Sequence, residues 1–200
     1  IVENCSAENV TVNGEGRNSF AGGLTGSAQR ADLCDVRALT MNGDSSRIRG
    51  KGYVGGIAGV QNDTNIYNAY VAGTVGGNGS RATGGITGLY ESGNLIVAWF
   101  EGEIGRTNQG AAAHEGTFIG TREFRSGFRY GTGRSDHVSY LYAGREAQAK
   151  NAVGSSIPDD NTWTYDAHIG YVTDYGRKYV RVAGKNREGC GERFFYEELE

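Results

Sequence analysis

The segment Ala21-Gly22-Gly23-Leu24-Thr25-Gly26 returns as Val54-Gly55-Gly56-Ile57-Ala58-Gly59 and again as Thr83-Gly84-Gly85-Ile86-Thr87-Gly88. The copies start at positions 21, 54 and 83, which are 33 and 29 residues apart. A degenerate copy, Gly116-Thr117-Phe118-Ile119-Gly120, follows after a similar interval. Self-similarity at a fixed period is typical of repeat proteins, in which each unit covers the exposed face of the next.

A second landmark predicts which side chains stack between repeats. Four residues each precede a glycine by the same interval and recur in step with the hexapeptides: Cys5 (before Gly14), Cys34 (before Gly43), Tyr67 (before Gly76) and Ile96 (before Gly105). We expect these four side chains to form a ladder in the protein interior.

In such a ladder, Cys5 and Cys34 would lie about 4.8 Å apart, the spacing of neighbouring strands, which is within reach of a disulfide. The spacing leaves two outcomes open, a disulfide or a pair of stacked thiols. Cys190 is then left over, either as a free thiol or paired outside this chain.

Short alternating strands separated by turns are predicted for each unit. Val10-Thr11-Val12 and Ala38-Leu39-Thr40-Met41 alternate apolar and small polar residues, and each precedes an Asn-Gly turn signal. The glycines of the hexapeptide allow close approach of neighbouring backbones. We therefore expect an all-β fold, a right-handed parallel β-helix (solenoid) of about four coils. A glycine-rich β-sandwich is the alternative.

The chain divides into two parts by composition. Residues 1–120 hold the repeats, whereas residues 121–200 lose the Gly-Gly element and are rich in Tyr and Arg. Strands are expected at 124–130 and 138–142, a short helix at 145–152, and a hairpin that joins 167–172 to 178–182. This β-rich C-terminal subdomain either caps the solenoid or contacts another subunit.

Composition excludes several classes of function. The chain has 34 Gly and 1 Pro in 200 residues and a formal net charge of −3, which is too small to indicate a nucleic-acid partner. Its apolar runs are shorter than the ~20 residues of a membrane span. Because Ile1 already lies in repeat sequence, we expect this chain to be part of a longer protein or to stack end to end with identical subunits.

The Gly-Gly-(Leu/Ile)-(Thr/Ala)-Gly units resemble the GLUG repeats of bacterial surface proteins. Those repeats are similar to ones in the N-terminal region of the secreted zinc metalloproteases that cleave immunoglobulin A. The resemblance covers residues 1–120 and implies a non-catalytic β-helix at an extracellular or cell-surface location, with any chemistry in a separate downstream domain.

Catalytic patterns are incomplete in this chain. His114-Glu115 begins a zinc-protease motif, but Phe118 occupies the position of the second His. Asp159-Asp160 after Pro158 could be a carboxylate pair, but Pro-Asp-Asp-Asn is ordinary turn chemistry. We therefore expect no enzyme activity, no cofactor and no metal.

Three functions remain. The first is a non-catalytic extracellular scaffold or adhesive spacer of a larger secreted protein, which contacts a host protein or a glycan. The second is a structural subunit that assembles head to tail into an extracellular fibre. The third, disfavoured by the missing carboxylate cluster, is a β-helix enzyme that acts on glycans.

Overall fold

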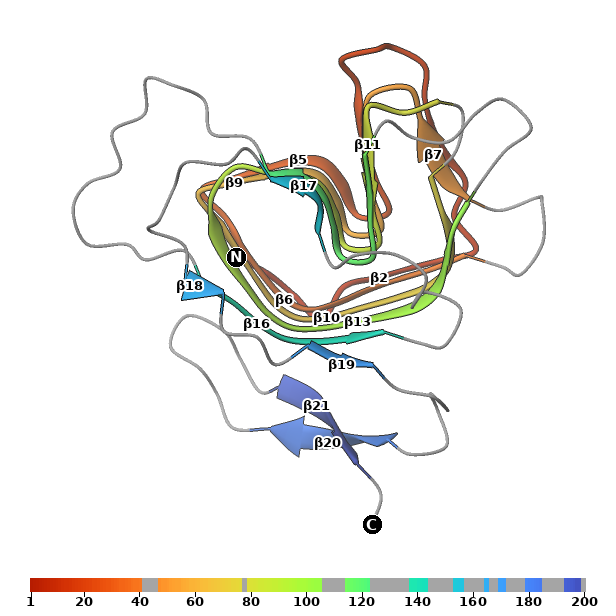
Figure 1. The fold of residues 1–200 in the computed structure, drawn as a ribbon. Helices are drawn as coiled ribbons and strands as arrows, with labels where there is room; N and C mark the ends of the chain where they lie inside the picture. The colour runs from red at the N-terminus through yellow and green to blue at the C-terminus, as the bar shows by residue number, and fades with distance from the viewer. Residues whose placement is uncertain are drawn as a thin grey trace.

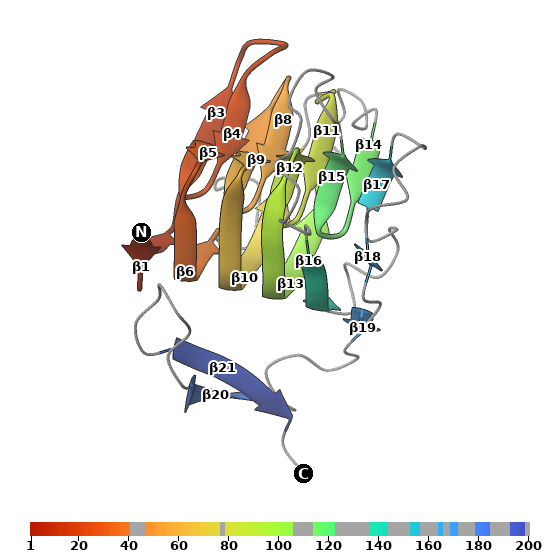
Figure 2. The same cartoon turned by 90° about the vertical axis from the view of Figure 1, so that its left-hand side faces the viewer.

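The computed structural model describes residues 1–40, 47–76, 79–105, 114–122, 137–143, 153–156, 164–165, 169–171, 179–184 and 193–198. Every regular element in these ranges is a β-strand. The strands wind into successive coils whose equivalent segments pair in parallel, so the protein is a parallel β-solenoid, as the repeats predict (Figures 1 and 2).

The first sheet contains the longest strands. Its main path runs through β1 (Val2–Glu3), β6 (Asp32–Leu39), β10 (Thr64–Val75), β13 (Gly93–Ile104), β16 (His137–Ala143) and β18 (Thr164–Tyr165). Four further strands join this sheet beside the path: β2 (Ser6–Glu8), β3 (Val12–Gly14), β7 (Ile48–Gly50) and β19 (Ile169–Tyr171). Figure 2 shows β6, β10, β13 and β16 side by side along the solenoid.

Two shorter sheets close each coil opposite the first sheet. The second sheet has the order β14 (His114–Gly116), β11 (Ala82–Gly84), β8 (Tyr53–Gly55), β4 (Phe20–Gly22). The third has the order β17 (Val153–Ser156), β15 (Ile119–Arg122), β12 (Thr87–Tyr90), β9 (Ala58–Asn62), β5 (Thr25–Gln29). The Gly-Gly-aliphatic segment of each repeat connects the second sheet to the third.

The register places equivalent residues of the repeats over one another. Gly22 pairs with Gly55, Gly55 with Gly84 and Gly84 with Gly116. Backbone hydrogen bonds continue the alignment through the bend: the Leu24 N–H donates to the Ile57 carbonyl, the Ile57 N–H to that of Ile86, and the Ile86 N–H to that of Phe118. The aliphatic position of the hexapeptide is therefore a single column along the solenoid.

The paired glycines allow the chain to fold inward. Between the second and third sheets the backbone dips toward the first sheet (Figure 1). A Cβ on Gly56 would lie 2.6 Å from the Cγ1 of Val71 on the first sheet and would also overlap the Gly85 carbonyl. A Cβ on Gly55 would lie 2.7 Å from the Gly88 nitrogen. Only glycine fits at this bend, because backbone of the next coil lies on one side and a core side chain on the other.

The third glycine of the hexapeptide has a different role. A Cβ on Gly59 would lie 2.5 Å from the Ala21 nitrogen in the neighbouring coil, and one on Gly88 would lie 2.5 Å from the Val54 nitrogen. The two arms of the inward bend therefore pack backbone against backbone. This close packing explains why the repeat keeps three glycines rather than a single turn residue.

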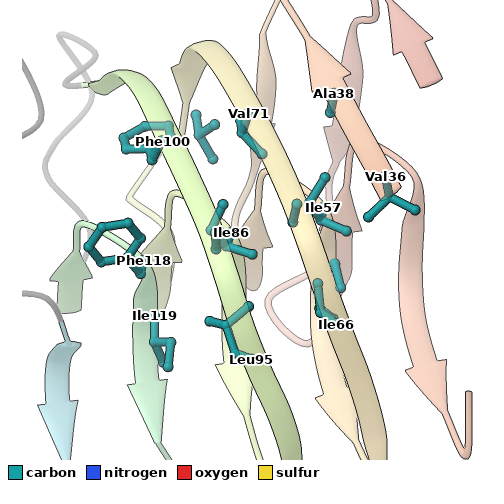
Figure 3. Close-up of a cluster of buried hydrophobic side chains, with 14 of the residues drawn as sticks. Val36, Ala38, Ile57, Ile66, Val71, Ile86, Leu95, Phe100, Phe118 and Ile119 are labelled. Carbon is teal, nitrogen blue, oxygen red and sulfur yellow. The ribbon is translucent and has the colours of Figure 1, made fainter. Parts of the chain in front are cut away.

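The core lies between the inward bend and the first sheet, and it widens along the axis. On the first sheet, Val71 pairs with Ala38 on one side and with Phe100 on the other. Each of the three side chains faces a glycine of the bend: Ala38 faces Gly23, Val71 faces Gly56 and Phe100 faces Gly85. Across from them, Ile57, Ile86 and Phe118 are fully buried, while Leu24 is half-buried. Figure 3 shows both rows. The side chain that faces the bend thus grows from Ala to Val to Phe over three coils.

Parallel stacking continues past residue 120. Strands β16, β18 and β19 extend the first sheet, and β17 extends the third. The expected strand at 138–142 lies within β16, whereas 124–130 and 145–152 lie outside the described residues. The domain boundary at residue 120 stays a prediction, because repeat composition and strand stacking do not end at the same place.

The expected hairpin between 167–172 and 178–182 is wrong. Residues 169–171 form β19, which pairs in parallel with β16. The antiparallel hairpin instead joins β20 (Tyr179–Gly184) to β21 (Arg193–Glu198). Alternating apolar residues identified the strands but not their partners. Strand β21 also contacts β6 and β10, so the hairpin lies against the outer face of the first sheet (Figure 2).

No helix in the described ranges has the length and apolar character needed to cross a bilayer.

Candidate functional site

The predicted interior ladder lies on the outer face of the first sheet. Tyr67 pairs with Cys34 on one side and with Ile96 on the other, so three of its four members are stacked. Their side chains point away from the core, because the preceding residues in each strand, Leu33, Ile66 and Leu95, occupy the core cluster. Cys34 is nevertheless fully buried and Ile96 nearly so, while Tyr67 is half-buried.

Cys5 is not part of this ladder, which corrects the expected alignment. Cys34 pairs with Glu3, and the pairing of Ser6 with Arg37 places Cys5 beside Val36. The glycine landmark shifts as well, because Gly14 pairs with Gly50. The second coil has more residues between Cys34 and Gly50 than the first coil has between Glu3 and Gly14. Residues at equal distances from a glycine in the sequence therefore do not occupy equivalent positions in the two coils. Gly43 lies outside the described residues.

The two described cysteines are in different chemical states. Cys5 is exposed, and its thiol is free. Cys34 is disulfide-bonded. The expected pair, whether a disulfide or stacked thiols, is therefore absent, because Cys5 and Cys34 do not face one another. Cys190, the remaining cysteine of the chain, lies outside the described residues.

A column of left-handed residues bends β6, β10 and β13 and continues at the break between β1 and β2. Asn4, Asp35, Asn68 and Val97 have φ angles of 51°, 53°, 53° and 58°. Asn and Asp tolerate this conformation, whereas a β-branched residue is strained in it. The Asn68 side-chain amide donates to the Asp35 carboxylate, which links two coils. Asn or Asp at three of the four equivalent positions is the sequence pattern that could have predicted this left-handed column. Val97 interrupts the pattern, because valine rarely adopts a left-handed conformation.

A second polar column runs beside the first. The Asn65 Nδ2 donates to the Asp32 carboxylate at 2.7 Å, and the Asn94 Nδ2 donates to the Asn65 Oδ1 at 2.8 Å. In both columns the side-chain amides and carboxylates form hydrogen bonds with one another from coil to coil. They therefore stabilise the stack and offer few free donors or acceptors to a ligand.

Gln61 is a fully buried amide with every group satisfied. Its Nε2 donates to the carbonyls of Thr64 and Asn94, both at 2.9 Å, and its Oε1 accepts from the Thr87 hydroxyl at 3.2 Å. The contacts lie on three segments, so Gln61 ties the corner of one coil to the next. Its role is structural, because no ligand-facing group is left.

Aromatic and cationic side chains gather at the corner before the second sheet. The Phe20 and Tyr53 rings stack with centroids 5.7 Å apart, and the Arg81 Cζ lies 5.0 Å from the Tyr53 centroid. An Arg81 Nη1 donates to the Asn18 Oδ1 at 3.3 Å. Arg81 therefore reaches across the second coil to the first, and its guanidinium lies over the Tyr53 ring.

The incomplete zinc motif lies on a strand. His114 and Glu115 belong to β14, and Phe118 is buried in the core. On a strand, the two residues point to opposite faces and cannot converge on one ion. The residues that the structure describes contain no group of three or more His, Cys, Asp or Glu side chains that could hold a metal.

The first coil forms an open edge of the solenoid. Among the strands that the structure describes, β1 and β2 pair only with β6, β4 pairs only with β8, and β5 pairs only with β9. Ile1 and Val2 are exposed to 73% and 40%. The free side of this coil therefore offers backbone donors and acceptors together with apolar surface, which is the chemistry that an added strand uses.

Comparison of the chain with protein-family models, with curated proteins and with solved structures gives no match in any of the three.

Proposed function

We propose that this chain is a non-catalytic scaffold module, a β-solenoid that spaces or presents parts of a larger extracellular protein. The observation that carries the proposal is the interlocked stack of coils, in which backbone pairing, side-chain ladders and the apolar column all repeat along one axis. Each added coil lengthens such a stack by about 4.8 Å without a change of cross-section.

An extracellular location is supported by two features. The disulfide at Cys34 is of a kind that persists in oxidising compartments. The glycine repeats of residues 1–120 resemble those of bacterial surface proteins. The described interior is filled by aliphatic and aromatic side chains, and its buried polar groups, such as Gln61, serve the stack.

The open first coil favours a second candidate, a subunit that assembles head to tail into a fibre. A heterologous contact that does not close on itself produces a filament. The exposed edge formed by β1, β2, β4 and β5 is one half of such a contact. The two candidates differ in whether the edge is met by the same polypeptide or by a second copy of this chain.

Sedimentation velocity and negative-stain microscopy of the purified chain distinguish them. A module remains a monomer over a wide concentration range, whereas a fibre subunit forms rods. Val2→Lys places a charge on the edge strand and should dissolve such rods, whereas Val2→Thr keeps an uncharged, β-branched residue there and should not. Rods that survive Val2→Lys would remove the edge as the contact, and rods of the unmodified chain would overturn the module proposal.

A further inference from the structure

Asparagines occupy two bends of the first coil. Asn4 lies in the break between β1 and β2, and Asn9 lies in the break between β2 and β3. Their φ angles are 51° and 57°, so each adopts the left-handed conformation that asparagine tolerates. Both residues are exposed, and neither side-chain amide forms a hydrogen bond with a residue that the structure describes. The first coil therefore presents two accessible amides.

Each of these asparagines begins an Asn-x-Ser/Thr triplet. The triplets are Asn4-Cys5-Ser6 and Asn9-Val10-Thr11. Ser6 and Thr11 are exposed as well, so the amide residue and the hydroxyl residue of each triplet both reach the surface. In exported proteins this triplet, with any residue except proline in the middle, is the acceptor sequence for N-linked sugars.

A third triplet, Asn62-Asp63-Thr64, has the same sequence pattern but a closed environment. Thr64 is fully buried, and its hydroxyl donates to the Asn62 carbonyl at 2.9 Å. Asn62 is half-buried, and its Oδ1 accepts from the Ser92 hydroxyl at 3.5 Å. A glycan on Asn62 would displace these contacts, whereas the exposed triplets of the first coil have no such contacts to lose. Asn78, which begins a fourth triplet, lies outside the described residues.

The exposed triplets also lie on the open edge of the solenoid. The Asn4 N–H donates to the Cys34 carbonyl at 3.1 Å, so the second coil covers one side of this residue. At the equivalent position of an inner coil, Asn68 is buried, and its amide donates to the Asp35 carboxylate of the neighbouring coil. A further strand would approach the edge to about 4.8 Å, which leaves no room for a sugar. A glycan on Asn4 and a strand paired with this edge therefore exclude one another.

We propose that Asn4 and Asn9 are N-glycosylation sites. In the transfer, the side-chain nitrogen of the asparagine bonds to the anomeric carbon of a sugar that is carried on a diphosphate. The bond between this carbon and the diphosphate oxygen breaks, the diphosphate leaves with the electron pair, and the amide nitrogen loses a proton. A bulky, hydrated glycan at each bend keeps further strands from the open edge, a surface that other proteins protect with charges or prolines.

This inference rests on the proposed function, because N-linked sugars are added to exported proteins, and it deepens that proposal by stating how the open edge is kept from assembling. The two can fail separately. A chain that is monomeric but carries no glycan retains the module and loses the glycosylation sites. A chain that carries both glycans and still forms rods keeps the sites and overturns the module.

The test is site-resolved mass spectrometry of the protein as its own cells export it. Peptide N-glycosidase converts a glycosylated asparagine to aspartate, and digestion in heavy-oxygen water labels each such site. A digest without the glycosidase controls for spontaneous deamidation. We expect the label at Asn4 and Asn9 and not at Asn62. Masses of the intact glycopeptides distinguish an oligosaccharide from a lipid-linked donor and a single sugar from a nucleotide-linked donor.

Matched variants show whether the triplet itself is used. Ser6→Ala removes the hydroxyl that the acceptor sequence requires and should abolish the glycan on Asn4, whereas Ser6→Thr keeps a hydroxyl and should retain it. Because Ser6 is exposed, both variants should melt as the wild type does, so a lost glycan reports on the acceptor and not on folding. The proposal is overturned if either Asn4 or Asn9 is unmodified, if Asn62 is modified to the same extent, or if Ser6→Ala keeps its glycan.

Discussion

Gly56→Ala tests the inward bend that defines this solenoid. The new Cβ would lie 2.6 and 2.8 Å from the two Cγ atoms of Val71 and would overlap the Gly85 carbonyl. Val71 is fully buried. The Gly85 carbonyl belongs to the backbone of the next coil, where the Gly85 N–H donates to the Thr117 carbonyl at 3.1 Å, so neither neighbour can move freely.

Overpacking of this kind costs about 1–3 kcal/mol, and contact with fixed backbone places Gly56→Ala near the upper end. The reduced freedom of alanine in the unfolded chain offsets about 0.4–1 kcal/mol. We therefore expect a net loss of about 2 kcal/mol in the free energy of unfolding, which corresponds to a melting temperature lowered by roughly 4–8 °C for a chain of this size.

The measurement is thermal unfolding followed by far-ultraviolet circular dichroism. Gly16→Ala is the matched control, because its Cβ would meet nothing closer than Ser19 at 3.9 Å on an exposed segment. The control should melt within about 2 °C of the wild type, as surface substitutions do. If Gly56→Ala melted as the wild type does, or if both variants lost the same amount, the close packing of the bend would be refuted.

Three further outcomes are expected. Val97→Asn should raise the free energy of unfolding by about 1 kcal/mol, because Asn tolerates the left-handed backbone, whereas Val97→Thr should give no gain in the same urea titration. Gln61→Glu should destabilise the protein by about 2 kcal/mol at neutral pH, since a buried carboxylate would face two carbonyls. Burial raises the pKa of the introduced carboxyl in the folded state, so this loss should shrink as the pH falls, and a constant loss between pH 7 and 4 would contradict the assignment. Peptide mapping without reduction should find Cys5 alkylated and Cys34 in a disulfide. The only other cysteine of the sequence is Cys190, so a disulfide within one chain would join Cys34 to Cys190. A peptide that joins Cys5 to Cys34 would contradict the strand register.

The solenoid was predictable from the sequence because its strongest constraint is local. Where backbone meets backbone there is room only for glycine, so Gly55 and Gly84 had to recur wherever the bend recurs. The aliphatic residue that follows them had to recur too, because the bend carries it into the core. The all-β class and the parallel stacking are confirmed on these grounds.

The surface was harder to predict because no single residue type is required there. The expected position of Cys5 was wrong because Gly14 pairs with Gly50 and not with Gly43, and a spacing in sequence cannot show where the extra residues of the second coil enter. The strand alternation points Cys34 outward because Leu33 faces the core, and the left-handed residue Asp35 then interrupts the alternation so that Val36 faces the core again.

The graded widening of the core, from Ala38 to Val71 to Phe100, has a consequence for how the chain finds its register during folding. Parallel coils with identical interiors could pair one whole unit out of step and still satisfy their hydrogen bonds. Here a displaced pairing would set Phe100 against the space that fits Val71, or leave a void where Phe100 belongs. Each coil thus accepts one neighbour in one order, and misassembled stacks are penalised before the chain is complete.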